Sequence, residues 1–137
     1  IMSLPKKKLA LLQGSTTIPR MYIHIEQYGL DPVLKTIVYK IEVGIQKGQN
    51  VHLHTVKKTY DELKDFDEMI RPLFIESRFL MPFPPKKIFG RKTKEFLDER
   101  FECLQKYLLN IVRVSGMKNI PAFIRCFEID TDLLMDI

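Results

Sequence analysis

The chain carries the stretch PFPPKKIFG at residues 82–90, followed by a segment of helical pattern that contains Arg100. Prolines hold a loop extended and cannot continue a helix, so this stretch must separate two structural elements. The residues behind the prolines are basic, and no acid comes before Glu95; the bases are Lys86, Lys87, Arg91, Lys92 and Lys94. A rigid loop that presents cations beside the start of a helix is suited to hold an anion.

The composition indicates one globular domain. The 137 residues are 45% hydrophobic and 28% charged, and no apolar run approaches the ~20 residues that span a bilayer. We expect residues 1–18 to be a linker with a tag remnant, residues 19–129 to fold, and residues 130–137 to form a tail. Two cysteines, Cys103 and Cys126, fit reduced thiols in an intracellular protein.

The formal net charge of +5 favours a polyanionic partner such as a phosphoinositide, an anionic lipid surface or a nucleic acid. Nucleic acid is not expected, because no stacking-aromatic motif accompanies the basic clusters.

The segments before the proline loop predict a meander of strands and then a helix. Apolar and β-branched residues at 21–27, 35–45 and 51–56 are separated by short turns. Thr59 is placed to cap a helix that begins at Tyr60. The expected buried stripe of this helix consists of Leu63, Phe66, Met69, Ile70 and Leu73.

Two further helices are expected after the loop. Thr93 caps a long one that ends at Ser115-Gly116, and Pro121 begins a short one. The buried stripe of the long helix consists of Leu97, Phe101, Leu104, Leu108 and Ile111. The predicted fold class is α+β: a three-stranded antiparallel sheet packed on a helical subdomain with a proline-rich loop.

No catalytic or metal site is indicated. His52 and His54 share one face of a predicted strand, but no carboxylate or cysteine stands at ligand spacing, so solvated histidines are the simpler interpretation. The acids at 61–68 follow one another in a single helix and fit a solvated face. We therefore expect no enzyme activity in this chain, and no cofactor.

Several local sequences resemble the phox-homology (PX) domain. They are Lys58-Thr59-Tyr60-Asp61-Glu62-Leu63, Pro84-Pro85-Lys86 with Gly90, Phe96-Leu97-Asp98-Glu99-Arg100-Phe101, and Tyr107-Leu108. The resemblance spans residues 19–129 and implies a phosphoinositide-binding module that targets membranes. It also implies roles for individual residues: Lys86 would pair with the 1-phosphate of the lipid, Arg100 would bind ring hydroxyls or a 4-phosphate, and Tyr60 would stack on the inositol ring.

One position departs from the family's pattern. The family places an arginine before the aromatic residue to bind the 3-phosphate, and this chain has Thr59, preceded by Lys58. Thr-aromatic-Asp-Glu at this junction is similar to the PX domains of class II phosphoinositide 3-kinases. That likeness implies a preference for phosphatidylinositol 4,5-bisphosphate and a kinase catalytic domain outside this chain. A sorting-nexin PX domain with an atypical pocket is the alternative within the family.

The likeness further implies a location in the cytoplasm and on membranes: the plasma membrane, endosome or Golgi. The expected membrane contacts are Phe79, Leu80, Met81, Lys87, Arg91 and Lys92, although Leu80 is also expected to close the core. A second function class stays open, because Pro82-x-x-Pro85-x-Lys87 matches the form that Src-homology-3 domains recognise.

Overall fold

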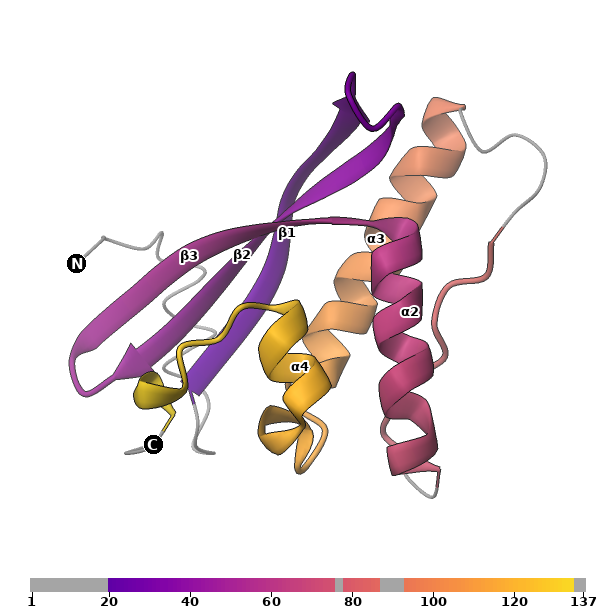
Figure 1. Ribbon diagram of the computed structural model, residues 1–137. Coiled ribbons are helices and arrows are strands. Elements are labelled where there is room, and N and C mark those ends of the chain that lie inside the picture. The colour runs from indigo at the N-terminus through magenta and orange to yellow at the C-terminus, as the bar shows by residue number, and fades with distance from the viewer. Residues whose placement is uncertain (1–19, 76–77, 87–92, 135–137) are drawn as a thin grey trace.

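A computed structural model describes residues 20–75, 78–86 and 93–134 of the chain. The strands are β1 (Arg20–Asp31), β2 (Thr36–Lys47) and β3 (Asn50–Thr59). The α-helices are α2 (Tyr60–Ile70), α3 (Lys94–Ile111) and α4 (Pro121–Cys126). Short 3-10 turns follow them: η1 (Arg71–Phe74), η2 (Met117–Asn119) and η3 (Thr131–Leu133). In Figure 1 the helices gather on one side of the curved sheet.

The sheet is antiparallel with the order β1-β2-β3, so the predicted meander and the α+β class are confirmed. β1 is longer than its sequence pattern indicated, because Gly29 and Leu30 still pair with Val38 and Ile37. In the turn beyond, the Asp31 carboxylate accepts hydrogen bonds from the amides of Val33 and Leu34, at 2.8 and 2.9 Å. This Asx-type turn holds the tip of the first hairpin in a defined shape.

The core lies between the inner face of the sheet and the helices. Side chains of the sheet such as Ile23, Ile41 and Val43 are fully buried, as are Leu104, Leu108 and Ile111 of α3. The structure differs in two ways from what the sequence predicted for α3. Leu97 and Phe101 are only partly buried, and α3 ends at Ile111 rather than at Ser115-Gly116. Gly116 instead has a φ of 86° in the turn that precedes η2.

The stripe predicted for the first helix is wrong at its far end. Leu63, Phe66 and Ile70 are buried, but Met69 is 53% exposed and Leu73 is 62% exposed. α2 ends at Ile70 and Pro72 lies in the 3-10 turn that follows, so the helical periodicity does not continue to Leu73.

A polar network ties α2 to α3 and to the start of the proline segment. Asp67 is 5% exposed and accepts hydrogen bonds from Tyr107 Oη at 2.6 Å and from the Arg71 guanidinium at 2.7 and 2.9 Å. The same guanidinium donates to the carbonyl of Met81 at 2.8 Å. Asn110 donates to the Phe79 carbonyl and accepts from the Met81 amide. The backbone that leads into residues 82–86 is therefore fixed to both helices.

His54 and His24 make polar contacts with other parts of the protein, which differs from a fully solvated strand face. His54 Nε2 lies 2.7 Å from the carbonyl of Phe127, and His24 Nδ1 lies 3.1 Å from Gln105 Nε2. His52 is exposed. Among the described residues no group of three or more His, Cys, Asp or Glu is arranged to hold a metal ion.

Candidate headgroup site

Arg100 is held between two aromatic rings. The Thr93 hydroxyl caps α3 by accepting from the Phe96 amide at 3.2 Å, and this start places Arg100 one turn after Phe96. The Cζ atom of Arg100 lies 3.9 Å from the centroid of Tyr60 and 4.4 Å from that of Phe96. A cation over a ring face is attracted by the ring's quadrupole. The two rings thus fix the guanidinium without neutralising it.

Arg100 forms no ion pair within the described part of the chain. Its Nη2 atom is buried and has no hydrogen-bond partner. Buried polar atoms in folded proteins are nearly always paired, so an unpaired guanidinium nitrogen calls for a ligand or a water. The positive charge is felt nearby, because it opposes the rise in the pKa of the Tyr60 hydroxyl that burial causes.

Tyr60 joins this arginine to the proline segment. Its hydroxyl donates to the carbonyl of Pro84 at 2.6 Å, and its ring lies 5.3 Å from that of Phe83. The residue is 7% exposed, and Arg100 lies over its ring. The stacking of Tyr60 on an inositol ring stays a prediction; in this structure Tyr60 positions Arg100 and the loop.

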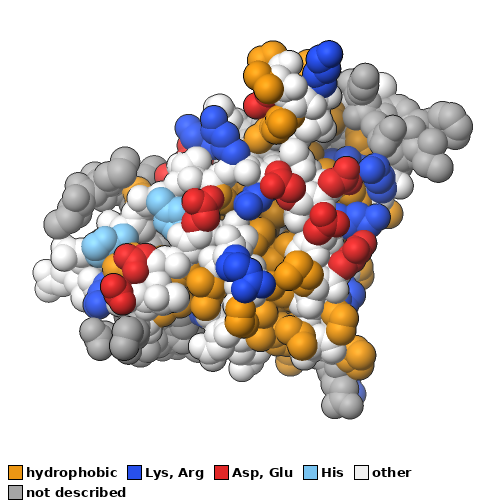
Figure 2. All heavy atoms as spheres, viewed as in Figure 1, with side chains coloured by type: hydrophobic (Ala, Val, Ile, Leu, Met, Phe, Trp, Pro, Cys, Tyr) orange, Lys and Arg blue, Asp and Glu red, His pale blue; other side chains and the backbone are white. Residues whose placement is uncertain are grey.

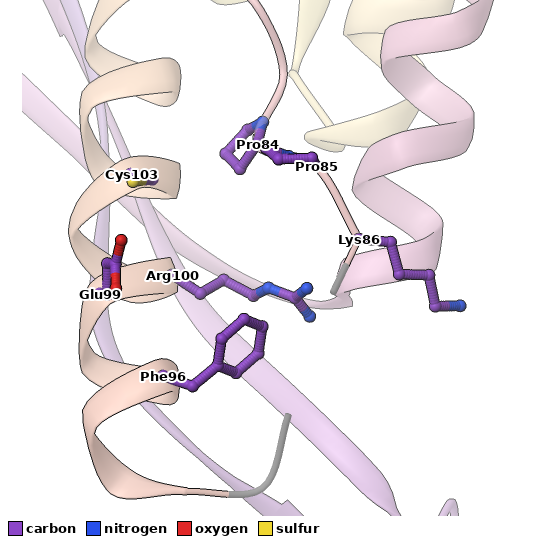
Figure 3. Close-up of a pocket in the computed structure, with 7 residues that line it drawn as sticks. All are labelled: Pro84, Pro85, Lys86, Phe96, Glu99, Arg100 and Cys103. Atoms are coloured by element: carbon purple, nitrogen blue, oxygen red, sulfur yellow. The ribbon is translucent and has the colours of Figure 1, made fainter. Parts of the chain in front are cut away.

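A cavity of about 340 Å³ lies between α3 and the proline segment. Figure 3 shows Arg100 reaching from α3 toward the backbone of the loop. The lining residues are Pro84, Pro85, Lys86, Phe96, Glu99, Arg100 and Cys103. Cavities of this size accommodate small ligands. The structure therefore brings together Lys86 and Arg100, the two cations that the sequence singled out.

Lys86 already has an acidic partner. Its Nζ atom lies 3.1 Å from Oδ1 of Asp61, in the first turn of α2, and the two side chains are 42% and 67% exposed. The side chain of Lys86 leaves the loop on the side away from the Arg100 guanidinium (Figure 3). Of the two cations, Arg100 faces the cavity unpaired and Lys86 is held at its rim.

Lys58 and Thr59 are not among the residues that line the cavity. Thr59 is the N-cap of α2: its hydroxyl accepts from the Glu62 amide at 3.1 Å, and its own amide donates to the Glu62 carboxylate at 3.0 Å. Lys58 lies close enough to Cys126 to lower the pKa of that thiol, which burial nevertheless raises to about 11. A high pKa keeps the thiol protonated and unreactive.

The predicted membrane contacts need correction. Leu80 is 7% exposed and belongs to the core, so the expectation that it closes the core is confirmed and its membrane role is wrong. Met81 is partly buried, and its amide is bonded to Asn110. Phe79 is 77% exposed. Lys87, Arg91 and Lys92 lie outside the described residues.

Phe79 lies near the opposite end of α2 from the cavity, and its membrane contact stays a prediction. Asp61, at the start of α2, contacts Lys86 at the cavity, whereas Arg71, directly after the helix, contacts Met81. A helix of 11 residues separates these two points by about 16 Å. Other exposed apolar side chains share that far end: Met69, Leu73 and Ile75.

The sequence reasoning missed an apolar tip on the first hairpin. Val33 is 86% exposed, Leu30 68% and Leu34 60%. Figure 2 shows apolar side chains gathered at this tip, at the end of the molecule where α3 begins in Figure 1. The signal was present, because apolar residues directly after Pro32 are unusual in a turn that solvent surrounds.

The hairpin tip lies at the same end as the start of α3. Gln105 bonds the backbone of Ile25, and farther along β1 the Tyr28 hydroxyl donates to Asp98, about two turns nearer the start of α3. β1 therefore runs antiparallel to α3, and its continuation past Tyr28 leads toward Lys94. The tip and the cavity face the same end of the domain.

The Src-homology-3 motif stays a prediction. Pro82 and Pro85 are exposed and lie in a segment that is neither helix nor strand, whereas Lys87 is outside the described residues. The described helices include none that is both long and apolar enough to pass through a bilayer.

The comparisons with solved structures agree with this architecture. The X-ray structure of a designed CISK-PX domain has a TM-score of 0.65 at 18% identity, covering 78% of this chain and 98% of that one. The crystal structure of the mouse SNX19 PX domain with bound sulphate ion has a TM-score of 0.62 at 14% identity, covering 82% and 99%. At these identities the likeness establishes the fold. No curated protein sequence matches the chain.

The family follows from the sequence itself. A model of the PX domain family matches residues 46–130, which is more than half of the chain. PX domains are non-catalytic modules that bind phosphoinositides and attach peripherally to membranes. The matched span includes the start of α2, the proline segment and α3, the three elements that surround Arg100. The chain belongs to the PX domain family.

Proposed function

We propose that this domain attaches to membranes by binding a phosphoinositide headgroup at the cavity, with Arg100 and Lys86 as its ligands. The observation that carries the proposal is the buried Nη2 atom of Arg100, which has no partner although two aromatic rings hold its guanidinium in place. A phosphate or a ring hydroxyl would supply the missing acceptor. A charge-assisted hydrogen bond of this kind contributes about 1.5–3 kcal/mol.

We further propose that phosphatidylinositol 4,5-bisphosphate is favoured over the 3-phosphate lipid. The support is Thr59, which stands where the family's pattern places an arginine for the 3-phosphate. The Thr59 hydroxyl is engaged in the capping box of α2, and Lys58 lies toward Cys126. Neither residue offers a bidentate fork. Loss of one charge-assisted bond lowers affinity about tenfold to a hundredfold.

The membrane-facing end of the domain would be the end that carries the hairpin tip. Val33 and Leu34 are exposed there, beside the start of α3. Burying one such side chain in the membrane interface contributes roughly 1.5–3 kcal/mol. Lys87, Arg91 and Lys92 follow the cavity residue Lys86 in the chain, and each would add about 1 kcal/mol near an anionic surface.

Thr59-Tyr60-Asp61-Glu62 supports a more specific origin. We propose that the parent protein is a class II phosphoinositide 3-kinase, with the gamma isoform as a candidate, whose kinase domain lies outside this chain. In this proposal residues 19–129 form the lipid-binding unit, residues 1–18 a linker with a tag remnant, and residues 130–137 a tail. The location would be the cytoplasm and the membranes that carry the lipid.

The test is vesicle flotation with a panel of all phosphoinositides at two salt concentrations. We expect Arg100→Ala combined with Lys86→Ala to lose at least tenfold in binding to the preferred lipid. Arg113→Ala combined with Lys94→Ala removes the same charge from exposed positions outside the cavity lining, one at the start of α3 and one just after its end, and should lose much less. Equal losses in the two double variants, or a loss that high salt abolishes, would mean that diffuse charge rather than a pocket binds the membrane.

A further inference from the structure

Lys86 and Arg100 line one cavity, but among the described residues only Lys86 of the two has an acidic partner. Arg100 Nη2 is unpartnered, whereas Lys86 Nζ is 3.1 Å from the Asp61 carboxylate. Asp61 comes from the first turn of α2, so the partner is supplied by a different element from the loop that carries Lys86. A ligand in the cavity meets one available cation and one that is occupied.

We propose that Asp61 is a specificity-determining residue, which keeps Lys86 from responding to singly charged lipids. The inference rests on the proposed headgroup site. Phosphatidylserine and the 1-phosphodiester of any phosphoinositide each carry about one negative charge, as the Asp61 carboxylate does. Such a group has no charge advantage over Asp61, and it must also separate an existing pair.

A phosphoinositide overcomes this barrier through Arg100. Once additional phosphates or ring hydroxyls are held by Arg100, the 1-phosphate is placed next to Lys86, and the exchange of Asp61 for phosphate becomes intramolecular. A singly charged lipid makes no second contact and gains no such help. Asp61 therefore lowers the background attraction to anionic lipid more than it lowers binding of the selected headgroup.

The size of the effect is bounded by the exposure of the pair. Both side chains are partly exposed, at 42% and 67%. Exposed pairs of this kind contribute up to about 1 kcal/mol, which corresponds to a factor of about five in binding. We expect a gain in phosphatidylserine binding of about twofold to fivefold when Asp61 is neutralised.

The experiment compares Asp61→Asn with Asp65→Asn. Asp65 is the matched control, because it lies one turn farther along α2, is exposed, and has no ion pair with Lys86. Both changes remove one negative charge, and both are made in the natural and in the Lys86→Ala background. Binding is measured on vesicles of phosphatidylcholine with phosphatidylserine, and on the same vesicles with phosphatidylinositol 4,5-bisphosphate.

We expect Asp61→Asn to raise binding to phosphatidylserine vesicles more than Asp65→Asn does, and the excess to vanish in the Lys86→Ala background. The preference for phosphoinositide vesicles should fall by the same factor. Equal gains in the two variants, or an Asp61→Asn gain that survives Lys86→Ala, would overturn the inference. A wild-type domain without phosphoinositide preference would remove the proposed function, and with it the specificity role of Asp61. The phosphatidylserine arm would then still show separately whether Asp61 shields Lys86 from singly charged lipids.

Discussion

At the scale of single residues, Tyr60 combines two functions that substitutions can separate. Its ring lies under Arg100, and its hydroxyl bonds the Pro84 carbonyl at 2.6 Å. Tyr60→Phe keeps the ring and should cost about 0.5–1.5 kcal/mol of stability for the lost hydrogen bond. Tyr60→Leu also removes the support of the guanidinium. We expect Tyr60→Leu to weaken binding of a soluble inositol bisphosphate severalfold more than Tyr60→Phe, by calorimetric titration; equal effects would show that the ring does not position Arg100.

At the scale of elements, the Asp67 network decides whether α2, α3 and the proline segment keep their arrangement. Asp67 is buried and bonds both Tyr107 and Arg71, and Arg71 in turn holds Met81. Asp67→Asn weakens charge-assisted bonds, so we expect a loss of about 1.5–3 kcal/mol in the free energy of unfolding. Glu68→Gln, the exposed neighbour, should change it by less than about 0.5 kcal/mol. Urea denaturation measures both, and similar values for the two would contradict a structural role for the network.

The elements also show what the sequence could and could not predict. Strands, helix starts and the caps Thr59 and Thr93 follow from local signals, and the structure has them. Met69 was wrongly placed in the core, because periodicity does not show which faces of a helix neighbouring elements cover. Pairing of Phe96 with Arg100 is local to α3, whereas Tyr60 is brought to the same guanidinium by the packing of α2. The Asp61–Lys86 pair is likewise a tertiary contact that spacing along the chain could not show.

At the scale of the whole molecule, two exposed apolar regions among the described residues distinguish two orientations on a membrane. The hairpin tip with Val33 and Leu34 shares an end with the cavity, whereas Leu73 and Ile75 lie beyond the far end of α2. Of these two described regions, a domain whose headgroup cavity faces the bilayer can insert the tip but not Leu73 and Ile75. Each buried side chain contributes roughly 1.5–3 kcal/mol, so Val33→Ser with Leu34→Ser should weaken vesicle binding more than tenfold.

The control for this prediction is Leu73→Ser with Ile75→Ser, which removes similar exposed apolar area from the opposite end. All four side chains are at least 60% exposed, so neither double variant removes a core contact, and thermal unfolding should change little. Weakened binding of the control with unchanged binding of the tip variant would place the far end against the membrane. Phe79 would then lie at the membrane, as the sequence suggested, and Arg100 would face away from the lipid. A single pair of variants therefore tests both the orientation of the domain and the headgroup site.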